Sequence, residues 1–365
     1  MNKVLVGMSG GVDSAVAAAL LMDQGYEVVG TTLKLWEGLD NGESTATKSC
    51  CSLEDVEDAR ATAFKLNIPF YVLNMKKLFE EKVVHHFIES YKEGNTPNPC
   101  IECNRFVKFQ AMYEKALALG MDYIATGHYA RVEFDEPSGR YLLKKGIDSK
   151  KDQSYVLYML KQDQLRRILF PLGGLTKAEV RKIATSKGFR VSEKPDSQDI
   201  CFVEDGKYSD FIEKHSEGKR KAGDFLKRGK IIGKHKGIIN YTIGQRKGLG
   251  IAYGEPLYVI DKNVADNTVV LGDAEERYRK SFIVFDMNYI AFEIPPAEFH
   301  AKAKIRYSVA EHDATITPMK EGRAKVEFTQ PQRDIAPGQI VVFYKEEIVL
   351  GGGVIEKVEI LEKEH

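Results

Sequence analysis

Residues 3–14, KVLVGMSGGVDS, decide the fold of the first part of this chain. Residues 3–8 are almost all apolar and rich in β-branched side chains, which is typical of a strand buried on both faces of a parallel sheet. Residues 9–11 bring a serine and two glycines, and the following alanine- and leucine-rich run predicts a helix that ends near Gly25. The stretch therefore predicts a strand, a glycine turn and a helix start in direct succession.

The glycine turn is suited to hold an anion. A helix start presents unpaired N–H groups and partial positive charge, and glycine lets a phosphate approach the backbone closely. The lysine of G-x-x-x-x-G-K-[ST] and the third glycine of G-x-G-x-x-G are both missing. SGGVDS instead resembles the pyrophosphate loop of the PP-loop ATPases, which split ATP between its α and β phosphates. The resemblance implies that Asp13 and Ser14 face phosphates or Mg²⁺; the alternative is a simple strand-to-helix turn.

The composition is that of a globular protein. Of the 365 residues, 43% are hydrophobic and 29% are charged, and the length suggests two or three domains. No apolar run approaches the length of a membrane span, and the first predicted strand begins almost at the N-terminus. We therefore expect a cytoplasmic protein without membrane segment or signal peptide. The formal net charge is zero, so a nucleic-acid partner has to be met by local basic patches.

Strands and helices alternate over the first part of the chain. Their periodicities predict further strands at 26–35, 69–74 and 122–126, and helices at 53–67, 78–91 and 106–119. This alternation is typical of a doubly wound α/β domain with a parallel sheet. Ligands of such sheets bind beyond the carboxyl ends of the strands. The predicted nucleotide pocket is therefore lined by residues 7–14, Leu33, Gly127 and His128.

The pattern changes twice in the second part of the chain. A hairpin is predicted over 131–145 and helices over 153–168 and 177–187. Between Lys207 and Lys247, twelve lysines and arginines occur with only four acidic residues, so this neutral protein carries a basic segment in its middle. From about Ser281 onward, short strands separated by turns predict a small β-barrel. The predicted domains are an α/β domain at 1–205, a small basic domain at 206–280 and a β-barrel at 281–365.

Five cysteines in a chain of this length do not make a disulfide scaffold. Cys100 and Cys103 form a Cys-x-x-Cys after two prolines and before the helix predicted from about Phe106. The dipole of that helix would lower the pKa of Cys103 and favour its thiolate. A reactive pair, a structural zinc site, a redox pair of the thioredoxin type and buried packing cysteines are all compatible with this pattern.

Seven motifs follow one another along the chain: SGGVDS, SCCSLEDVEDA, NTPNPCIECNRFVKF, DYIATGHYAR, KDQSYVLYML, DSQDICF and YTIGQRKGLG. In this order they resemble the bacterial tRNA-specific 2-thiouridylases, the MnmA family, essentially from end to end. The resemblance implies a PP-loop enzyme that uses ATP and Mg²⁺ to adenylate O2 of the wobble uridine in tRNAs for Glu, Gln and Lys. That oxygen is then replaced by sulfur, which a cysteine desulfurase or a sulfur-relay protein supplies.

The resemblance also implies roles for individual positions. The implied ATP-binding residues are Gly7, Met8, Ser9, Gly10, Gly11, Val12, Asp13, Ser14, Leu33 and Gly127. Contacts with tRNA, including its target base at the first three positions, are implied for Asn98, Pro99, Cys100, Lys151, Asp152, Gln153, Arg306 and Tyr307. Cys103 matches the family's nucleophile, and Cys201 matches the cysteine that carries a persulfide.

Cys100 departs from the commoner pattern of the family. Many relatives carry an aspartate there, with an acid or base role, and a thiol titrates well above a carboxyl group, so Cys100 cannot take over that role. With Cys103 and Cys201 it resembles the class of tRNA thiolation enzymes in which three thiolates hold a 4Fe-4S cluster. Two mechanisms stay open: a persulfide on Cys201 that ends in a disulfide with Cys103, or a hydrosulfide bound to the cluster. For this sequence we favour the cluster slightly.

Basic clusters are candidates for contacts with tRNA phosphates, because an enzyme that takes a base out of its stack has to hold the surrounding backbone. The competing interpretation of each cluster is an ordinary solvated surface. The candidates are the clusters at 144–145, 150–151, 219–221, 227–228 and 245–247.

Several other residues have ordinary structural interpretations. Cys50 and Cys51 stand directly before Ser52, a predicted N-cap for the next helix. His128 is expected to make hydrogen bonds in a loop, and Trp36, the single tryptophan, is expected to pack against other side chains.

Two other classes of function share part of the pattern. An amide-forming PP-loop ligase of the GMP-synthetase type would share SGGVDS but would give no use to the Cys-x-x-Cys or the basic segment. A nucleic-acid-binding protein with a degenerate ATP fold would be expected to carry a damaged loop, whereas SGGVDS is intact. Release of AMP and pyrophosphate that depends on tRNA separates these functions.

Overall fold

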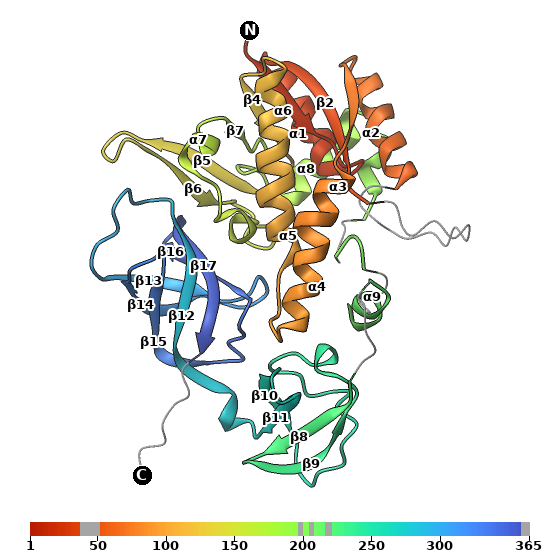
Figure 1. Cartoon of the computed structure of the whole chain (residues 1–365). Helices are drawn as coiled ribbons and strands as arrows, with labels where there is room; N and C mark the ends of the chain where they lie inside the picture. The colour runs from red at the N-terminus through yellow and green to blue at the C-terminus, as the bar shows by residue number, and fades with distance from the viewer. Residues whose placement is uncertain (37–51, 196–199, 204–207, 216–220, 359–365) are drawn as a thin grey trace. The chain divides into compact units, whose positions relative to one another are not determined.

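The computed structural model describes residues 1–36, 52–195, 200–203, 208–215 and 221–358 (Figure 1). The chain forms two compact units, and each contains a buried hydrophobic cluster. The first unit comprises Met1–Val84, Pro99–Glu204 and Glu346–Leu350. The second comprises His85–Asn98, Asp205–Lys345 and Gly351–His365.

A five-stranded parallel sheet forms the centre of the first unit. From one edge to the other its strands are β3 Phe70–Asn74, β2 Glu27–Lys34, β1 Lys3–Gly7, β4 Tyr123–Ala125 and β7 Ile168–Leu169. The central strand β1 is the apolar run at the start of the sequence, and its Val4, Leu5 and Val6 are at most 1% exposed. The four strands predicted in this region are confirmed, within one or two residues at their ends.

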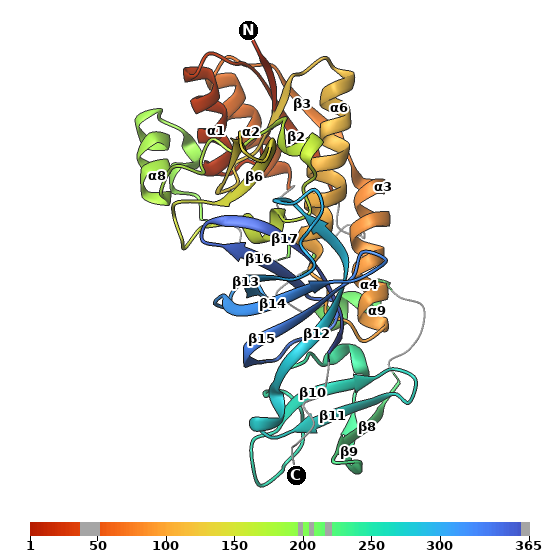
Figure 2. The same ribbon diagram turned by 90° about the vertical axis from the view of Figure 1, so that its left-hand side faces the viewer.

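Helices cover both faces of this sheet. Val4 and Val6 of β1 face a core that includes side chains from α1 and α2, whereas a Cβ on Gly7 would contact the sulfur of Met112 in α6. Figure 2 shows α1 and α2 on one side of the sheet and α6 on the other, so the predicted doubly wound α/β fold is confirmed. The helices of this layer are α1 Val12–Asp23, α2 Leu53–Lys65, α6 Met112–Ala118 and α8 Lys177–Ser186.

The helix that carries the Cys-x-x-Cys begins earlier than predicted. It starts at Pro99 rather than near Phe106 and continues as α5 Pro99–Glu102, the π-helical segment η2 Cys103–Ala111 and α6. Proline suits the first position of a helix, because its fixed φ is helical and its missing N–H would have no partner there. The second of the two prolines before Cys100 is therefore the first residue of the helix.

The segment between residues 130 and 169 contains a confirmed and a wrong prediction. The hairpin is present as β5 Ala130–Asp135 and β6 Arg140–Lys145. The helix predicted over 153–168 is wrong, because this stretch forms a short 3-10 turn, one turn of helix and strand β7. Tyr155, Leu157 and Tyr158 are completely buried, so this run is apolar because it fills a core and not because it forms one face of a helix. These elements are η3 Ser154–Leu157, α7 Gln162–Leu165 and β7 Ile168–Leu169.

The second unit contains a small sheet and a barrel. The small sheet has the order β10-β11-β8-β9, and the barrel has the order β12-β15-β14-β13-β16-β17 and closes through the pairing of β12 with β17. The barrel predicted for the C-terminal part is therefore confirmed. The strands of the small sheet are β8 Gly223–Lys227, β9 Lys230–His235, β10 Tyr258–Asn263 and β11 Thr268–Gly272. The strands of the barrel are β12 Tyr278–Tyr289, β13 Phe299–Lys304, β14 His312–Pro318, β15 Ala324–Arg333, β16 Ile340–Lys345 and β17 Ile348–Val358.

The remaining helical segments of the described residues are short. They are α3 Lys76–Phe79, the π-helical η1 Glu80–Val84, α4 His85–Lys92, the 3-10 segments η4 Arg190–Glu193, η6 Ile238–Asn240 and η7 Glu275–Arg277, and α9 Tyr208–His215. Within the described ranges, no helix is both long enough and apolar enough to cross a membrane.

Candidate functional site

The glycine turn joins β1 to α1 and leaves the start of the helix open. Met8 is tied to strand β2, because its N–H donates to the carbonyl oxygen of Thr31 at 2.7 Å and its own carbonyl accepts from Thr32 Oγ1 at 2.6 Å. Gly11 is the N-cap residue of α1, and it makes no side-chain cap. Backbone N–H groups at the helix start are therefore the donors that this turn offers to an anion.

Ser14 shapes the turn from inside. Its Oγ accepts from the N–H of Ser9 at 3.1 Å and donates to the carbonyl oxygen of Gly11 at 3.1 Å. Ser14 is buried. The hydroxyl is thus engaged in holding the loop, and the contact with phosphate or Mg²⁺ that the resemblance implies for it stays a prediction.

Gly10 packs directly against the start of α2. Its φ of +72° is one that glycine adopts easily, and a Cβ at this position would lie 2.2 Å from the carbonyl oxygen of Asp55. Ser52 caps α2 as predicted, in a capping box with Asp55. The turn is therefore fixed by β2 on one side and by α2 on another.

Lys194 holds α2 from the far end of the unit's sequence. Its Nζ lies 2.8 Å from Asp55 Oδ1 and 2.7 Å from Asp58 Oδ2. Burial alone would lower the pKa of Lys194, but the hydrogen bonds to the two carboxylates outweigh burial, and the pKa is raised. This cation therefore anchors the chain a few residues before Cys201 to the helix that supports Gly10.

Asp13, in the first turn of α1, is held by two residues from distant parts of the sequence. Lys177 Nζ, at the start of α8, lies 2.8 Å from each of its carboxylate oxygens. The hydroxyl of Tyr129 donates to Asp13 Oδ1 at 2.7 Å. The predicted role of Asp13 toward phosphate or Mg²⁺ therefore has to be considered together with a bound ammonium group.

Gly127 closes the other side of the loop. A Cβ on Gly127 would lie 2.8 Å from the carbonyl carbon of Asp13 and 2.8 Å from the backbone nitrogen of Ser14. The segment after β4 therefore touches the first turn of α1 backbone to backbone. Sheet geometry predicts this meeting of two strand ends at one rim, and the structure brings Gly127 and residues 13–14 together there.

His128 is a structural residue, as predicted. Its Nδ1 is 2.7 Å from Thr126 Oγ1, and its ring packs against the rings of Phe109 and Phe170. Burial, with a smaller contribution from the charge of Lys108, holds the pKa of His128 well below its ordinary value. Trp36 likewise packs against other rings, those of Phe79 and Phe202.

The three cysteines differ in exposure. Cys100 is exposed, Cys103 is buried and Cys201 is intermediate. Because the helix begins at Pro99, Cys103 lies just beyond the first turn, where the helix dipole has little effect, so the predicted dipole argument fails for it. Cys50 and Cys51 lie outside the described residues.

The backbone at Cys103 is unusual. Here the helix changes from α to π, a form that is rare and often occurs at functional sites. The next residue, Asn104, is 2% exposed; its Nδ2 donates to the carbonyl of Val156 at 3.0 Å, and its Oδ1 has no hydrogen-bond partner among the described residues.

The described residues contain no group of three or more His, Cys, Asp or Glu side chains that is placed to hold a metal ion. Cys100, Cys103 and Cys201 all fall within the described ranges. The 4Fe-4S cluster that the resemblance implies for these three thiolates therefore stays a prediction.

The predicted tRNA contacts of the first unit have structural partners. Asp152 Oδ1 accepts from the N–H groups of Gly146 and Ser154 at 3.0 and 3.1 Å, and Gln153 Oε1 accepts from the N–H of Tyr129 at 3.0 Å. These two side chains therefore brace the loop that presents Tyr129 to Asp13. A direct contact between them and tRNA stays a prediction.

In the second unit, the two predicted contacts Arg306 and Tyr307 differ in exposure, because Arg306 is half-buried and Tyr307 is exposed. The guanidinium of Arg306 donates to the carbonyl oxygens of Ile243 and Asp334 at 3.2 and 2.8 Å, whereas Tyr307 is 44% exposed. Arg306 thus ties the small domain to the barrel inside this unit, and the exposed ring is the better placed of the two for contact with RNA.

Part of the basic segment is used internally. Lys227 Nζ lies 2.6 Å from Asp273 Oδ1 and 2.5 Å from Glu255 Oε1, and the hydrogen bond to Asp273 is the largest of the effects that raise its pKa. Arg228 pairs with Asp273 at 2.9 Å, and Lys144 of the first unit pairs with Glu133. These candidates for phosphate contacts are therefore already paired, and residues 219–220 lie outside the described residues.

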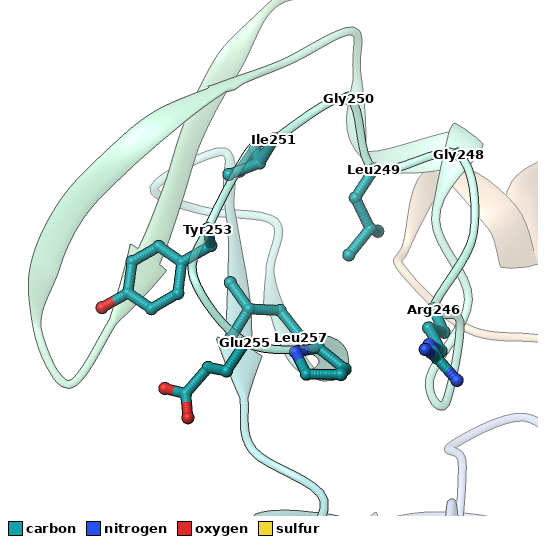
Figure 3. Close-up of a pocket in the computed structure, with 9 residues that line it drawn as sticks. Arg246, Gly248, Leu249, Gly250, Ile251, Tyr253, Glu255 and Leu257 are labelled. Atoms are coloured by element: carbon teal, nitrogen blue, oxygen red, sulfur yellow. The ribbon is translucent and has the colours of Figure 1, made fainter.

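The small domain contains a hollow of about 220 Å³ formed by the motif YTIGQRKGLG and the residues after it (Figure 3). Arg246 and Tyr253 lie on opposite sides of it, both exposed, and Lys227 Nζ is 4.6 Å from the centroid of the Tyr253 ring. An exposed guanidinium and an exposed ring beside a glycine-rich loop are a combination that suits a phosphate and a base.

Three residues of this site were not predicted to belong to it. Tyr129 stands inside a motif that was recognised, but its hydroxyl was given no role. Lys177 and Lys194 follow no motif that marks a nucleotide site, and each lies more than a hundred residues from the carboxylates that it binds. A capping signature at Thr176 and Glu179 was available in the sequence and fixes where α8 begins, but not what Lys177 contacts.

Comparison with protein-family models gives matches over most of the chain. Residues 2–205 match a model described as a tRNA methyl transferase HUP domain. Residues 209–273 match a tRNA methyl transferase PRC-barrel domain, and residues 279–355 match an aminomethyltransferase beta-barrel domain.

Curated relatives match the chain almost from end to end, and each is named tRNA-specific 2-thiouridylase MnmA. The protein of Acetivibrio thermocellus is 53% identical over 356 residues, which are 97% of this chain and 99% of that protein. The protein of Clostridioides difficile is 52% identical over 357 residues, 98% of each chain, and that of Carboxydothermus hydrogenoformans is 50% identical with the same coverage. The chain therefore belongs to the tRNA-specific 2-thiouridylase family, MnmA.

Proposed function

We propose that this protein is an ATP-dependent tRNA-uridine 2-sulfurtransferase. It adenylates O2 of the wobble uridine in tRNAs for Glu, Gln and Lys and then exchanges that oxygen for sulfur. The observation that carries the proposal is the intact loop of residues 7–14, whose helix start has no side-chain cap, in the same compact unit as Cys100, Cys103 and Cys201. Membership of the 2-thiouridylase family supports the choice of substrate.

The loop and its neighbours serve the activation step. A lone pair of uridine O2 forms a bond to the α-phosphorus of ATP, and the bond from that phosphorus to the α–β bridging oxygen breaks. The electron pair leaves with pyrophosphate, and the N3 proton passes to solvent, so C2 becomes an activated centre with AMP as its leaving group. The backbone N–H groups of Gly11 and the first turn of α1 bind the phosphates, and Gly127 keeps that turn in place.

Mg²⁺ suits this site as a partner of ATP. A carboxylate together with substrate phosphates and waters is the usual set of Mg²⁺ ligands, and Asp13 is the carboxylate at the start of α1. When bound, the ion supplies neutralisation of the phosphate charge. Asp13 is kept in position for this role by the hydroxyl of Tyr129.

Sulfur transfer is assigned to Cys201 and Cys103. The terminal sulfur of a persulfide on Cys201 forms a bond to C2, and the C2–O bond breaks as its electron pair leaves with AMP. The thiolate of Cys103 then attacks the Sγ of Cys201, which forms a Cys103–Cys201 disulfide and releases 2-thiouridine. A cellular thiol reduces this disulfide, and a cysteine desulfurase or a relay protein renews the persulfide. The cluster mechanism stays the alternative, which variants of Cys100 separate from the persulfide mechanism.

We also propose that the enzyme acts in the cytoplasm, since cysteines that must stay reduced and tRNA substrates occur together there. Cys103 is buried, which protects its thiol from oxidation between turnovers and helps to keep it reduced.

The proposed function is tested by the dependence of two products on tRNA. Purified protein with MgATP is expected to release AMP and pyrophosphate when an unmodified tRNA for Glu, Gln or Lys is added, and mass spectrometry is expected to find 2-thiouridine once a sulfur donor is supplied. A tRNA with another base at the wobble position is the control. Product release that needs an ammonia donor but no tRNA would support the ligase alternative, and transfer of a methyl group would contradict the thiolation proposal.

The exposed basic residues at the hollow give a further prediction. Replacing Arg246 and Lys247 together with alanine is expected to weaken tRNA binding and to flatten its salt dependence. The slope of log K against log salt concentration should fall in magnitude by about 1 to 2, because each phosphate contact contributes roughly 0.7 to 0.9. Filter binding between low and moderate salt measures this slope.

The control for this pair is the double variant Arg60→Ala/Lys77→Ala, which removes the same charge from exposed side chains of α2 and α3. It is expected to leave the slope unchanged. An unchanged slope in the Arg246/Lys247 variant would remove the hollow from the RNA-binding surface.

A further inference from the structure

The loop by itself offers little positive charge to balance the negative charge of ATP. ATP brings several negative charges to a turn whose own contribution is partial positive charge on backbone N–H groups. The sequence lacks the lysine that other phosphate loops carry, and the first turn of α1 adds a carboxylate, that of Asp13. A full positive charge close to this turn is therefore needed from elsewhere in the fold.

Lys177 brings that charge from α8. Its Nζ is 2.8 Å from both oxygens of Asp13, and its side chain is 12% exposed. The backbone at Lys177 is fixed independently, because its N–H donates to Asp148 Oδ2 at 2.9 Å and Thr176 caps the helix. Only the flexible side chain has to move for the ammonium group to change partner.

A second ion pair joins the same two helices. Lys187 Nζ lies 2.9 and 2.7 Å from the carboxylate oxygens of Asp23, at the other ends of α8 and α1. Each pair has the same sequence separation, but the second is more exposed, at 35% for Lys187 and 55% for Asp23.

The two helices also share an apolar core. Val12, Val16 and Ala19 of α1 pack with Val180 and Ala184 of α8 in one buried cluster. This contact supplies the packing energy, and a half-buried ion pair adds little to stability once its desolvation is counted. A role of the Asp13–Lys177 pair at the loop explains its position better than a role in joining the helices.

We propose that Lys177 is the phosphate-binding lysine of this loop. Without ATP its ammonium group pairs with Asp13, and when ATP binds it moves to the β and γ phosphates. The proposal rests on the function proposed above, since Lys177 would stabilise the negative charge that develops on the leaving pyrophosphate. As the bond from the α-phosphorus to the bridging oxygen breaks, the ammonium group faces the oxygen that gains the electron pair. Asp13, relieved of its partner, stays bonded to Tyr129 and is available to Mg²⁺.

The test uses pyrophosphate as the probe, without Mg²⁺ and without tRNA, and follows its binding by calorimetry. Lys177→Met is expected to weaken binding by about tenfold or more, the range for loss of a charged hydrogen bond. Asp13→Asn is expected to strengthen it, because the carboxylate that competes with pyrophosphate for Lys177 and its negative charge are both gone. Lys187→Met, the matched control, is expected to bind like the wild type.

The same variants separate a positioning role from a phosphate contact. If Lys177 only orients Asp13, both variants break the same pair and change pyrophosphate binding in the same direction, which would overturn the proposal. With MgATP and tRNA, Lys177→Met is expected to lower kcat for pyrophosphate release by about 10-fold to 100-fold, and Lys177→Arg to recover part of it.

Failure of this inference and failure of the proposed function give different results. Wild-type protein that binds pyrophosphate while Lys177→Met binds it equally well sinks the inference alone. Wild-type protein that neither binds pyrophosphate nor releases it from MgATP in the presence of tRNA contradicts the proposed function itself.

Discussion

Replacing Cys201 or Cys103 with serine is expected to abolish turnover of 2-thiolation of tRNA, by more than about 10³-fold, while the first tRNA-dependent release of pyrophosphate by each enzyme molecule proceeds at close to the wild-type rate. The first step uses the loop of residues 7–14, and the second uses sulfur. A serine hydroxyl keeps nearly the same shape but neither carries a persulfide nor attacks a disulfide bond. Pyrophosphate release and mass spectrometry of the tRNA measure the two steps separately.

The two serine variants are expected to fail in different ways. In Cys103→Ser, the persulfide sulfur still bonds to C2, but no thiolate attacks Cys201, so protein and tRNA stay joined through Cys201. This adduct should appear on a non-reducing gel and disappear when a thiol is added. Cys201→Ser should form no adduct. An adduct in both variants, or in neither, would contradict the assigned order of the two cysteines.

Cys100 separates the two sulfur mechanisms. In the persulfide mechanism Cys100 carries no sulfur, so Cys100→Ser is expected to keep most of the thiolation activity, and Cys100→Asp restores the residue of the commoner family pattern. In the cluster mechanism all three thiols are ligands, and Cys100→Ser should lose iron, brown colour and activity together. Anaerobically purified wild type that lacks iron and still thiolates tRNA would falsify the cluster mechanism.

Replacing Gly127 with alanine is expected to eliminate ATP-dependent activity, by more than about 10²-fold, without unfolding the protein. The new Cβ would lie 2.8 Å from two backbone atoms of residues 13–14, whereas carbon atoms in contact are normally about 3.5 to 4.0 Å apart. The first turn of α1 has to shift by a large fraction of an ångström or more, and misplacement of that order costs about 10²-fold in rate. Calorimetry with MgATP and the rate of pyrophosphate release measure the effect.

Gly174 provides the matched control in the same unit. A Cβ at Gly174 meets nothing within 4 Å, and its φ is not one that favours glycine. Glycine to alanine changes the entropy of the unfolded chain in a similar way at both positions, so the comparison isolates the steric effect. Gly174→Ala is expected to keep wild-type activity. If Gly127→Ala binds MgATP as tightly as Gly174→Ala does, the segment after β4 does not shape the nucleotide site.

Local patterns predicted those parts of the fold that local forces determine. The apolar run of residues 3–8 predicts a buried strand because burial on two faces demands apolar side chains at every position. Ser52 and Asp55 predict a helix start because the capping bonds form within a few residues. Where burial follows no helical period, the same reasoning fails: it predicts a helix over residues 153–168, although they fill a core around Tyr155.

The sequence by itself determined the loop, the alternation of strands and helices, and, through its ordered motifs, the family. Only the tertiary structure decided that Lys177 pairs with Asp13, that Gly127 touches the first turn of α1, and that Lys227 forms an ion pair with Asp273. The physical reason is that a strand or a cap is encoded in the spacing of neighbouring residues. The partner of a charged side chain more than a hundred residues away depends on how whole helices and strands pack, and no local spacing records it.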